Sequence, residues 1–207
     1  MRKKAIFALA VLAALVMPLS IAGDFTVVQA VEDITMDIEN MDILNTDTLT
    51  CEVDSSYYGE DETLSVSMVQ FDISDVRVGD NDVCVLLLKA ASVEKRVSSE
   101  SAQIGLSVMS SDWTEDSSLL DLANAVTASG PSASSALQAS DLDTDSIFAF
   151  DVSNRVKEVS AADDLISFSL IAVGDTDYRV DFKSRETGEG PCLLVMPYPL
   201  PITAVEG

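Results

Sequence analysis

The segment Ile166-Ser167-Phe168-Ser169-Leu170 alternates strictly between apolar and polar residues, and Leu64-Ser65-Val66-Ser67-Met68 shows the same pattern earlier in the chain. Period-two alternation with β-branched and aromatic residues is typical of half-buried strands. Val83–Leu88 is apolar without interruption, which predicts a central strand packed on both faces. The strands expected from these patterns cover 63–71, 83–91, 102–109, 147–152, 165–173, 178–183 and 192–196.

Residues that favour turns separate these strands, as in Asp80-Asn81-Asp82 and Gly188-Glu189-Gly190-Pro191. Helical spacing predicts one short helix within Ser117–Ala128, and a single helical turn is conceivable at 154–159. Ser129–Ser135 reads as a loop. Many short strands with few helices predict an all-β fold, an antiparallel β-sandwich of jelly-roll type. Its expected core includes Phe71, Leu86, Leu88, Trp113, Phe168, Leu170 and Leu194.

The N-terminus has the order of a secretory signal peptide. Arg2, Lys3 and Lys4 precede an apolar run from Ala5 to Met17, and small residues follow. Cleavage is expected after Ala22, with Ala30 as a second candidate, and a retained membrane anchor is the alternative. The sequence therefore predicts a secreted protein, extracellular or at the cell surface, with no membrane contact after cleavage. The expected parts are a signal peptide at 1–22, an acidic leader at 23–50 with one or two short strands, and one sandwich domain at 51–207.

The charge balance excludes several classes of function. The chain has 12 Lys and Arg against 35 Asp and Glu, and it has no His. Nucleic acid is not an expected partner, because its phosphates are bound mainly by Lys and Arg. Without His, neither a Ser-His-Asp triad nor a His-ligated metal site can form.

Five short motifs occur in order at Tyr58-Gly59, 69–74, 112–116, 150–156 and 180–195, and include Asp112-Trp113-Thr114-Glu115 and Lys183-Ser184-Arg185-Glu186. Together they resemble the DNRLRE-type family of secreted domains. Gln70 departs from the pattern, since the family carries Arg before the equivalent of Phe71. The resemblance implies a jelly-roll sandwich. Relatives occur as carbohydrate-binding modules on polysaccharide-degrading enzymes, and as disaggregatase-related repeats in surface proteins of methanogenic archaea; neither setting makes this domain an enzyme.

Four residues are weak candidates for contact with a glycan. Trp113 is the only Trp and is more easily interpreted as a core residue, because large aromatic rings bury much area. Tyr57 and Tyr58 could form a small platform or shape a turn. Arg185 could clamp an acidic sugar, but a structural ion pair is the preferred interpretation.

Asp141, Asp143 and Asp145 place carboxylates at alternate positions, as at the start of a calcium loop. Ser146 and Val152 stand where an EF-hand needs Gly and Glu, so the EF-hand interpretation fails. A looser Ca²⁺ site or a solvated acidic loop remain as alternatives, and no other cofactor is expected.

The chain has three cysteines, Cys51, Cys84 and Cys192. An odd number of cysteines in an exported protein predicts one disulfide bridge with a leftover thiol, or disulfide links between chains. Cys84 lies in the most apolar run and is expected to be a buried, inert thiol. Because first and last strands are often neighbours in jelly rolls, Cys51–Cys192 is the expected bond, within or between chains.

Two functions compete. The first is a non-catalytic envelope component that associates with its own copies or with other surface proteins. The second is a module that recognises an extracellular or cell-surface polysaccharide. The spare Cys, the strong acidity and an aromatic content of only 6% favour the first, and the family resemblance favours the second.

Overall fold

A computed structural model of the chain describes residues 25–44, 46–54, 62–63, 65–95, 102–127, 133–137, 144–160, 162–173 and 178–197. The strands are β1 (Thr26–Asp37), β2 (Asp42–Leu44), β3 (Thr48–Asp54), β4 (Glu62–Thr63), β5 (Ser65–Asp72), β6 (Val83–Lys95), β7 (Ala102–Met109), β8 (Ala133–Leu137), β9 (Ile147–Asp151), β10 (Leu165–Val173), β11 (Tyr178–Lys183) and β12 (Cys192–Met196). The helices are α2 (Leu119–Thr127), α3 (Ser153–Ser160) and the short 3₁₀ helix η1 (Arg185–Thr187).

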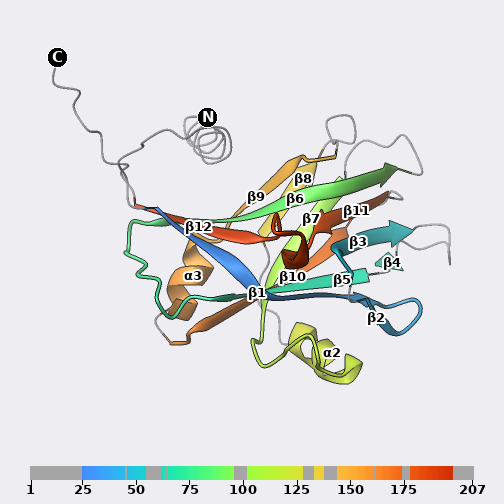
Figure 1. Ribbon diagram of the computed structural model, residues 1–207, viewed down its shortest axis with the longest axis horizontal. Helices are drawn as coiled ribbons and strands as arrows, with labels where there is room; N and C mark the ends of the chain where they lie inside the picture. The colour runs from blue at the N-terminus through green and yellow to red at the C-terminus, as the bar shows by residue number, and fades with distance from the viewer. Residues whose placement is uncertain are drawn as a thin grey trace, which may run out of the picture.

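The strands form the two layers of an antiparallel β-sandwich (Figure 1). One layer, called here the β5 layer, contains β2, the second half of β1, β5, β10, β7 and β8. The other, called the β6 layer, contains the first half of β1, β12, β6, β9, β11, β3 and β4. The predicted all-β sandwich is confirmed.

β1 belongs to both layers. Residues 26–29 pair with β12, and after an irregularity between Ala30 and Glu32 the strand pairs with β5. The segment 23–50, expected to be an acidic leader with one or two short strands, therefore contains a long strand at residues 26–37 that lies inside the sandwich. The irregularity explains why the sequence shows no clear period: Val28 packs against the main core, whereas Ile34 and Met36, further along, face the opposite side of the β5 layer.

The expected core residues are all buried, but in three separate clusters. Phe71, Leu86, Leu88, Phe168 and Leu170 lie between the two layers. Trp113 lies on the outer face of the β5 layer, beneath α2. Leu194 belongs to a small cluster with Val85 and Leu87 on the outer face of the β6 layer. As predicted from its uninterrupted apolar run, β6 is packed on both faces.

Two other elements differ from the sequence-based expectation. The single turn considered at 154–159 is the eight-residue helix α3, so the described chain has two α-helices rather than one. The loop expected at 129–135 overlaps β8, which pairs with β7 and forms the edge of the β5 layer. Ser and Ala carry little strand signal of their own, and here the neighbouring strand supplies the backbone hydrogen bonds.

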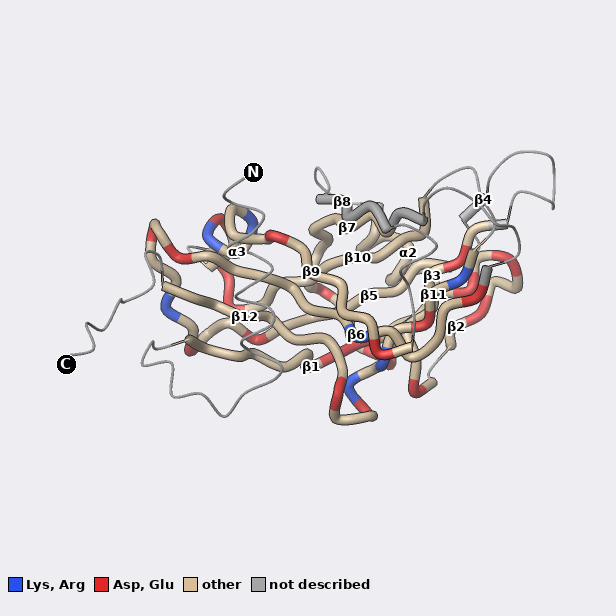
Figure 2. Tube along the Cα trace, turned by 90° about the horizontal axis from the view of Figure 1, so that it is seen from above, with Lys and Arg blue, Asp and Glu red and all other residues tan. Residues whose placement is uncertain are grey.

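Acidic residues occur at turns and strand ends around the whole molecule (Figure 2). Within the described ranges, no helix combines the length and the apolar character that crossing a bilayer requires.

Candidate functional site

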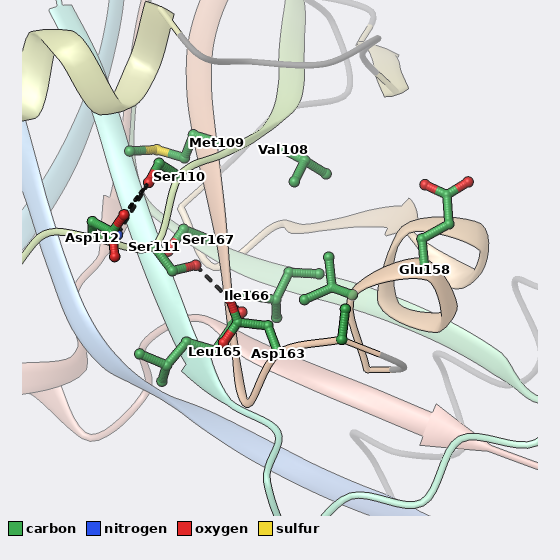
Figure 3. A pocket seen from close by; sticks show the side chains of 12 residues that line it. Val108, Met109, Ser110, Ser111, Asp112, Glu158, Asp163, Leu165, Ile166 and Ser167 are labelled. Carbon is green, nitrogen blue, oxygen red and sulfur yellow. Dashed lines mark hydrogen bonds between the residues drawn. The ribbon is translucent and has the colours of Figure 1, made fainter.

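A cleft of about 330 Å³ opens at one end of the sandwich, where the end of β7, the start of β10 and α3 meet (Figure 3). Its volume is at the lower end of the range for small-molecule sites. Its polar side chains are Ser110, Ser111, Asp112, Glu158, Asp163 and Ser167. Hydroxyl and carboxylate oxygens accept hydrogen bonds, so these side chains suit a ligand rich in hydroxyl or amine donors.

A buried hydrogen-bond network holds the floor of the cleft. Trp113 Nε1 and Gln70 Nε2 both donate to Ser167 Oγ, each over 3.1 Å, and Gln70 Nε2 also donates to the backbone oxygen of Ser111 over 2.9 Å. Ser111 Oγ donates to the backbone oxygen of Leu165. Buried polar groups that satisfy one another rigidify their surroundings, so these contacts tie the β7–α2 connection to β10 beneath the cleft.

A second polar cluster joins two motifs that are far apart in the sequence. Arg185 Nε and Nη2 donate to Glu115 Oε1 and Oε2, each over 2.8 Å, in a bidentate ion pair. The Trp113-Thr114-Glu115 and Ser184-Arg185-Glu186 motifs therefore meet beside β1. Gly190 lies so close that an added Cβ would be 2.6 Å from the Cα and backbone N of Arg185. Arg185 thus forms an ion pair of the kind preferred for it in the sequence analysis.

Asp33 brings a further carboxylate to this cluster. Its Oδ2 accepts the backbone N–H of Arg185 over 2.8 Å, and its own N–H donates to Glu115 Oε1. Burial raises the pKa of Asp33 to about 7, the Arg185 N–H opposes this, and Glu186 and Glu115 add to the rise. Ligand oxygens of Asp33, Glu115 and Glu186 lie within 4.8 Å of one another, a grouping that the sequence did not indicate.

Of the aromatic residues suggested as glycan contacts, the structure describes only Trp113. Trp113 is only 3% exposed, and its ring packs with Met68, Met109 and Leu122 rather than facing solvent. Tyr57 and Tyr58 lie outside the described residues. Trp113 contributes to the structure of the cleft indirectly, because its indole N–H donates to Ser167 Oγ and fixes that side chain at the floor of the cleft.

Of the three carboxylates suggested for calcium, Asp141 and Asp143 lie outside the described residues. Asp145 forms ion pairs with Lys89 at 3.0 Å and Lys183 at 3.3 Å, and Glu189 pairs with the same two lysines. Hydrogen bonds from Lys89 and Lys183 lower the pKa of Asp145. Asp145 is therefore engaged in an ion-pair cluster that ties the turn before β9 to β6 and β11.

All three cysteines are free, so the expected bond within the chain between Cys51 and Cys192 is not formed. β11 and β6 lie between β3 and β12 in the sheet, and Cys51 faces the main core whereas Cys192 packs on the outer face. Burial raises the pKa of Cys51 to about 12 and that of Cys84 to about 11, which makes both thiols unreactive. A link between chains through half-buried Cys192 stays a prediction.

The cleft itself was missed in the sequence analysis. Ser110, Ser111 and Asp112 follow β7, and Asp163 precedes β10, in stretches that read as ordinary polar turns. Only the antiparallel pairing of β7 with β10 brings the two turns together, with Ser167 opposite Met109.

The model of carbohydrate-binding module family 96 matches residues 43–197. A solved structure titled "Structural basis for the promiscuous specificity of the carbohydrate-binding modules from the beta-sandwich super family" is similar over 84% of this chain, with 10% identity and a TM-score of 0.24. The chain spans 56% of that structure's own length. No curated protein matches the chain. The family supports carbohydrate binding, the second of the two functions considered in the sequence analysis, better than the envelope role placed first. With its match extending over most of the sandwich, the chain belongs to carbohydrate-binding module family 96.

Proposed function

We propose that this protein is a non-catalytic module that binds an extracellular polysaccharide, and that the cleft between β7, β10 and α3 holds part of the sugar chain. The family match over residues 43–197 is the observation that carries the proposal. The signal-like N-terminus supports export, because Arg2, Lys3 and Lys4 precede an apolar run.

The chemistry of the cleft supports its choice as the sugar site. Sugars present many hydroxyl groups, and a cleft lined by the hydroxyls of Ser110 and Ser111 and by three carboxylates offers matching acceptors and donors. Val108 and Val159, both only partly buried, line the remaining wall and would cover the apolar face of a sugar ring. Because the floor is fixed by Gln70, Ser167 and Trp113, little conformational entropy would be lost on binding.

The test is a binding screen of purified protein from residue 23 onward against neutral, acidic and amino polysaccharides, by affinity electrophoresis and calorimetry. We expect binding to at least one polymer without release of reducing ends. Ala162→Tyr should weaken binding at least about tenfold, because Ala162 is an exposed residue of the cleft and the larger side chain would fill it.

Ala149→Tyr is the matched control, since Ala149 lies on the outer face of the β6 layer, away from the cleft. It should bind as the unmodified protein does. Failure to bind any polysaccharide would contradict the proposed function. Equal binding by the Ala162→Tyr and Ala149→Tyr variants would show that the site lies elsewhere.

A further inference from the structure

The outer face of the β6 layer carries a continuous apolar surface, called here the β12 face. Its residues come from β6, β9 and β12, and none of the described helices contributes to it. They are Val83, Val85, Leu87, Ile147, Ala149, Cys192, Leu194 and Met196. The neighbouring strand β1 extends this face, because Val27 lies opposite Leu194 and Gln29 lies opposite Cys192 in the antiparallel register.

The edge of the β12 face is open to solvent. Val27 is 47% exposed, and Phe25, just before β1, is 49% exposed. Val85 and Leu194 at the centre are buried, whereas Cys192 between them and the edge is only partly buried. Single exposed apolar residues are ordinary on a protein surface, but a contiguous group of them marks an interaction site.

The absence of charge distinguishes the β12 face from the rest of the protein. The chain has 35 Asp and Glu against 12 Lys and Arg, with a formal net charge of −23, yet none of the residues of this face is charged. Two copies of so acidic a protein repel one another wherever their charges meet. The uncharged face is where they can approach, and it is complementary to itself, as a two-fold contact between identical chains requires.

A sugar chain is a poor occupant for the same face. Its hydroxyl groups would lose their hydrogen bonds to water and find few polar partners among these side chains, which is costly. A second copy brings apolar side chains instead, and their burial is favourable. The chemistry of the face therefore selects a protein partner, and its lack of charge selects another copy of this chain.

The area of the face alone is small for a stable dimer. One outward side chain of a sheet covers about 30 Å², because strands are about 4.8 Å apart and side chains on one face repeat every ~6.7 Å. About ten such residues cover roughly 300 Å² in each copy, or roughly 600 Å² in two, against about 1,200 Å² at the lower end for stable complexes. Association without a covalent link would thus be weak.

Cys192 can supply the covalent link. It lies between Gln29 of β1 and Leu87 of β6, and its thiol is free. Burial raises the pKa of Cys192, so little reactive thiolate is present at neutral pH, and a thiol held against its partner has the advantage over one that meets it by free collision. Disulfides between facing sheets have a precedent in immunoglobulin domains.

We propose that two copies of this protein associate through the β12 face about a two-fold axis near Cys192, and that a disulfide between the two Cys192 residues holds the dimer together. The oxidant is a small-molecule disulfide. One Cys192 thiolate attacks it and releases the first small thiolate, and the second Cys192 thiolate then attacks the Cys192 sulfur of the mixed disulfide and releases the other. The two protons pass to the released thiolates.

The experiment incubates purified protein from residue 23 onward with oxidised and reduced glutathione at about 0.5 M salt, which screens the repulsion between copies. Non-reducing electrophoresis follows the covalent dimer, and mass spectrometry of peptides identifies the linked residues. We expect a dimer that reductant separates, joined at Cys192 in both copies. Cys192→Ser should stay monomeric in electrophoresis under the same conditions.

A pair of variants tests whether the β12 face directs the reaction. Val27→Glu should slow formation of the dimer at least about tenfold, because it would bury an unpaired carboxylate against apolar side chains of the second copy. Val173→Glu is the matched control, since Val173 is 36% exposed at the end of β10 in the other layer. It should form the dimer as fast as the unmodified protein, and circular dichroism checks that both variants are folded.

Equal rates for Val27→Glu and Val173→Glu would overturn this inference, because the disulfide would then arise from random collision of thiols. Linkage through Cys51 or Cys84 would overturn it too, since both are buried in the monomer. A protein that stays monomeric would also overturn it, whether its Cys192 reacts with a thiol reagent, as on an open face, or resists it, as on a face covered by something else. The proposed function is tested separately, because the β12 face lies away from the cleft.

Discussion

Asp33 is a buried carboxylate whose protonation is coupled to the fold. It is 4% exposed and accepts the N–H of Arg185 at the point where β1 crosses from one layer to the other. Its pKa of about 7 lies above the ordinary value of 3.8, so the folded protein binds this proton more strongly than the unfolded chain does. The contribution of Asp33 to stability is therefore most favourable at low pH and is lost as pH rises from about 4 to 7.

Asp33→Asn should remove this pH dependence, because the amide resembles the protonated acid and its oxygen can still accept the Arg185 N–H. The variant should gain stability relative to the unmodified protein by about 2 kcal/mol between pH 5 and pH 7, at about 1.4 kcal/mol per pH unit as an upper limit. The measurement is the free energy of unfolding in urea across pH 5–8.

Glu186→Gln is the control for this prediction, since Glu186 raises the pKa of Asp33 without contacting the Arg185 N–H in its place. It should lower the upper end of the pH-dependent window and so reduce the total change in stability, while the lower end, set by the unfolded chain, stays in place. Parallel stability curves for Asp33→Asn and the unmodified protein would contradict the assignment.

At the scale of elements, α2 and Trp113 cover the outer face of the β5 layer. Leu119, Leu122 and Val126 follow helical spacing and pack toward the same cluster as Trp113. Ser118 begins the helix, with its Oγ accepting the N–H of Asp121 over 3.3 Å. α2 therefore shields the apolar side chains of β1 and β5 on the outer face of the β5 layer from water. The β6 layer shields the inner face in the same way.

Trp113→Ala should destabilise the protein by about 3–5 kcal/mol, because a large buried side chain leaves a cavity. Trp113→Phe should cost less, about 1–2 kcal/mol, since it keeps most of the volume but loses the hydrogen bond to Ser167. Urea unfolding followed by circular dichroism measures both. A loss below about 1 kcal/mol for the Ala variant would mean that the ring is not part of the core.

For the whole molecule, two long strands bind the sandwich together. β1 pairs in both layers, and β6 pairs with β12 and β9 along its first half and with β11 along its second. Side-chain hydrogen bonds also link the two layers directly, because Ser65 and Ser67 of β5 donate to the Thr50 backbone oxygen of β3. No layer can separate without breaking these contacts.

Unfolding is consequently expected to be a single cooperative transition. Fluorescence of Trp113 reports on the outer cluster of the β5 layer, whereas far-ultraviolet circular dichroism reports on the strands of both layers. The two signals should change with the same midpoint in urea, as two-state unfolding requires. An earlier transition in fluorescence would mean that α2 and the outer cluster unfold independently.

Much of the fold could be predicted from the sequence, because strand alternation is a local property. The bounds expected for 102–109, 165–173, 178–183 and 192–196 are those of β7, β10, β11 and β12. The same reasoning recognised β6 as a strand packed on both faces, since an uninterrupted apolar run has no side suited to water. The five ordered motifs likewise pointed to a carbohydrate-binding module.

Tertiary structure decided what depends on contacts between distant residues. β1 could not be recognised from the sequence, because its bulge changes which residues face the core. No single alternation of apolar and polar residues therefore runs along the whole strand. Glu115 and Arg185 meet across 70 positions of sequence, and the cleft exists only because the turns beside β7 and β10 are brought together by strand pairing. Cys51 and Cys192 were expected to pair but are held apart by the order of strands in the sheet. Local patterns determine which segments become strands, whereas pairing order determines which side chains become neighbours.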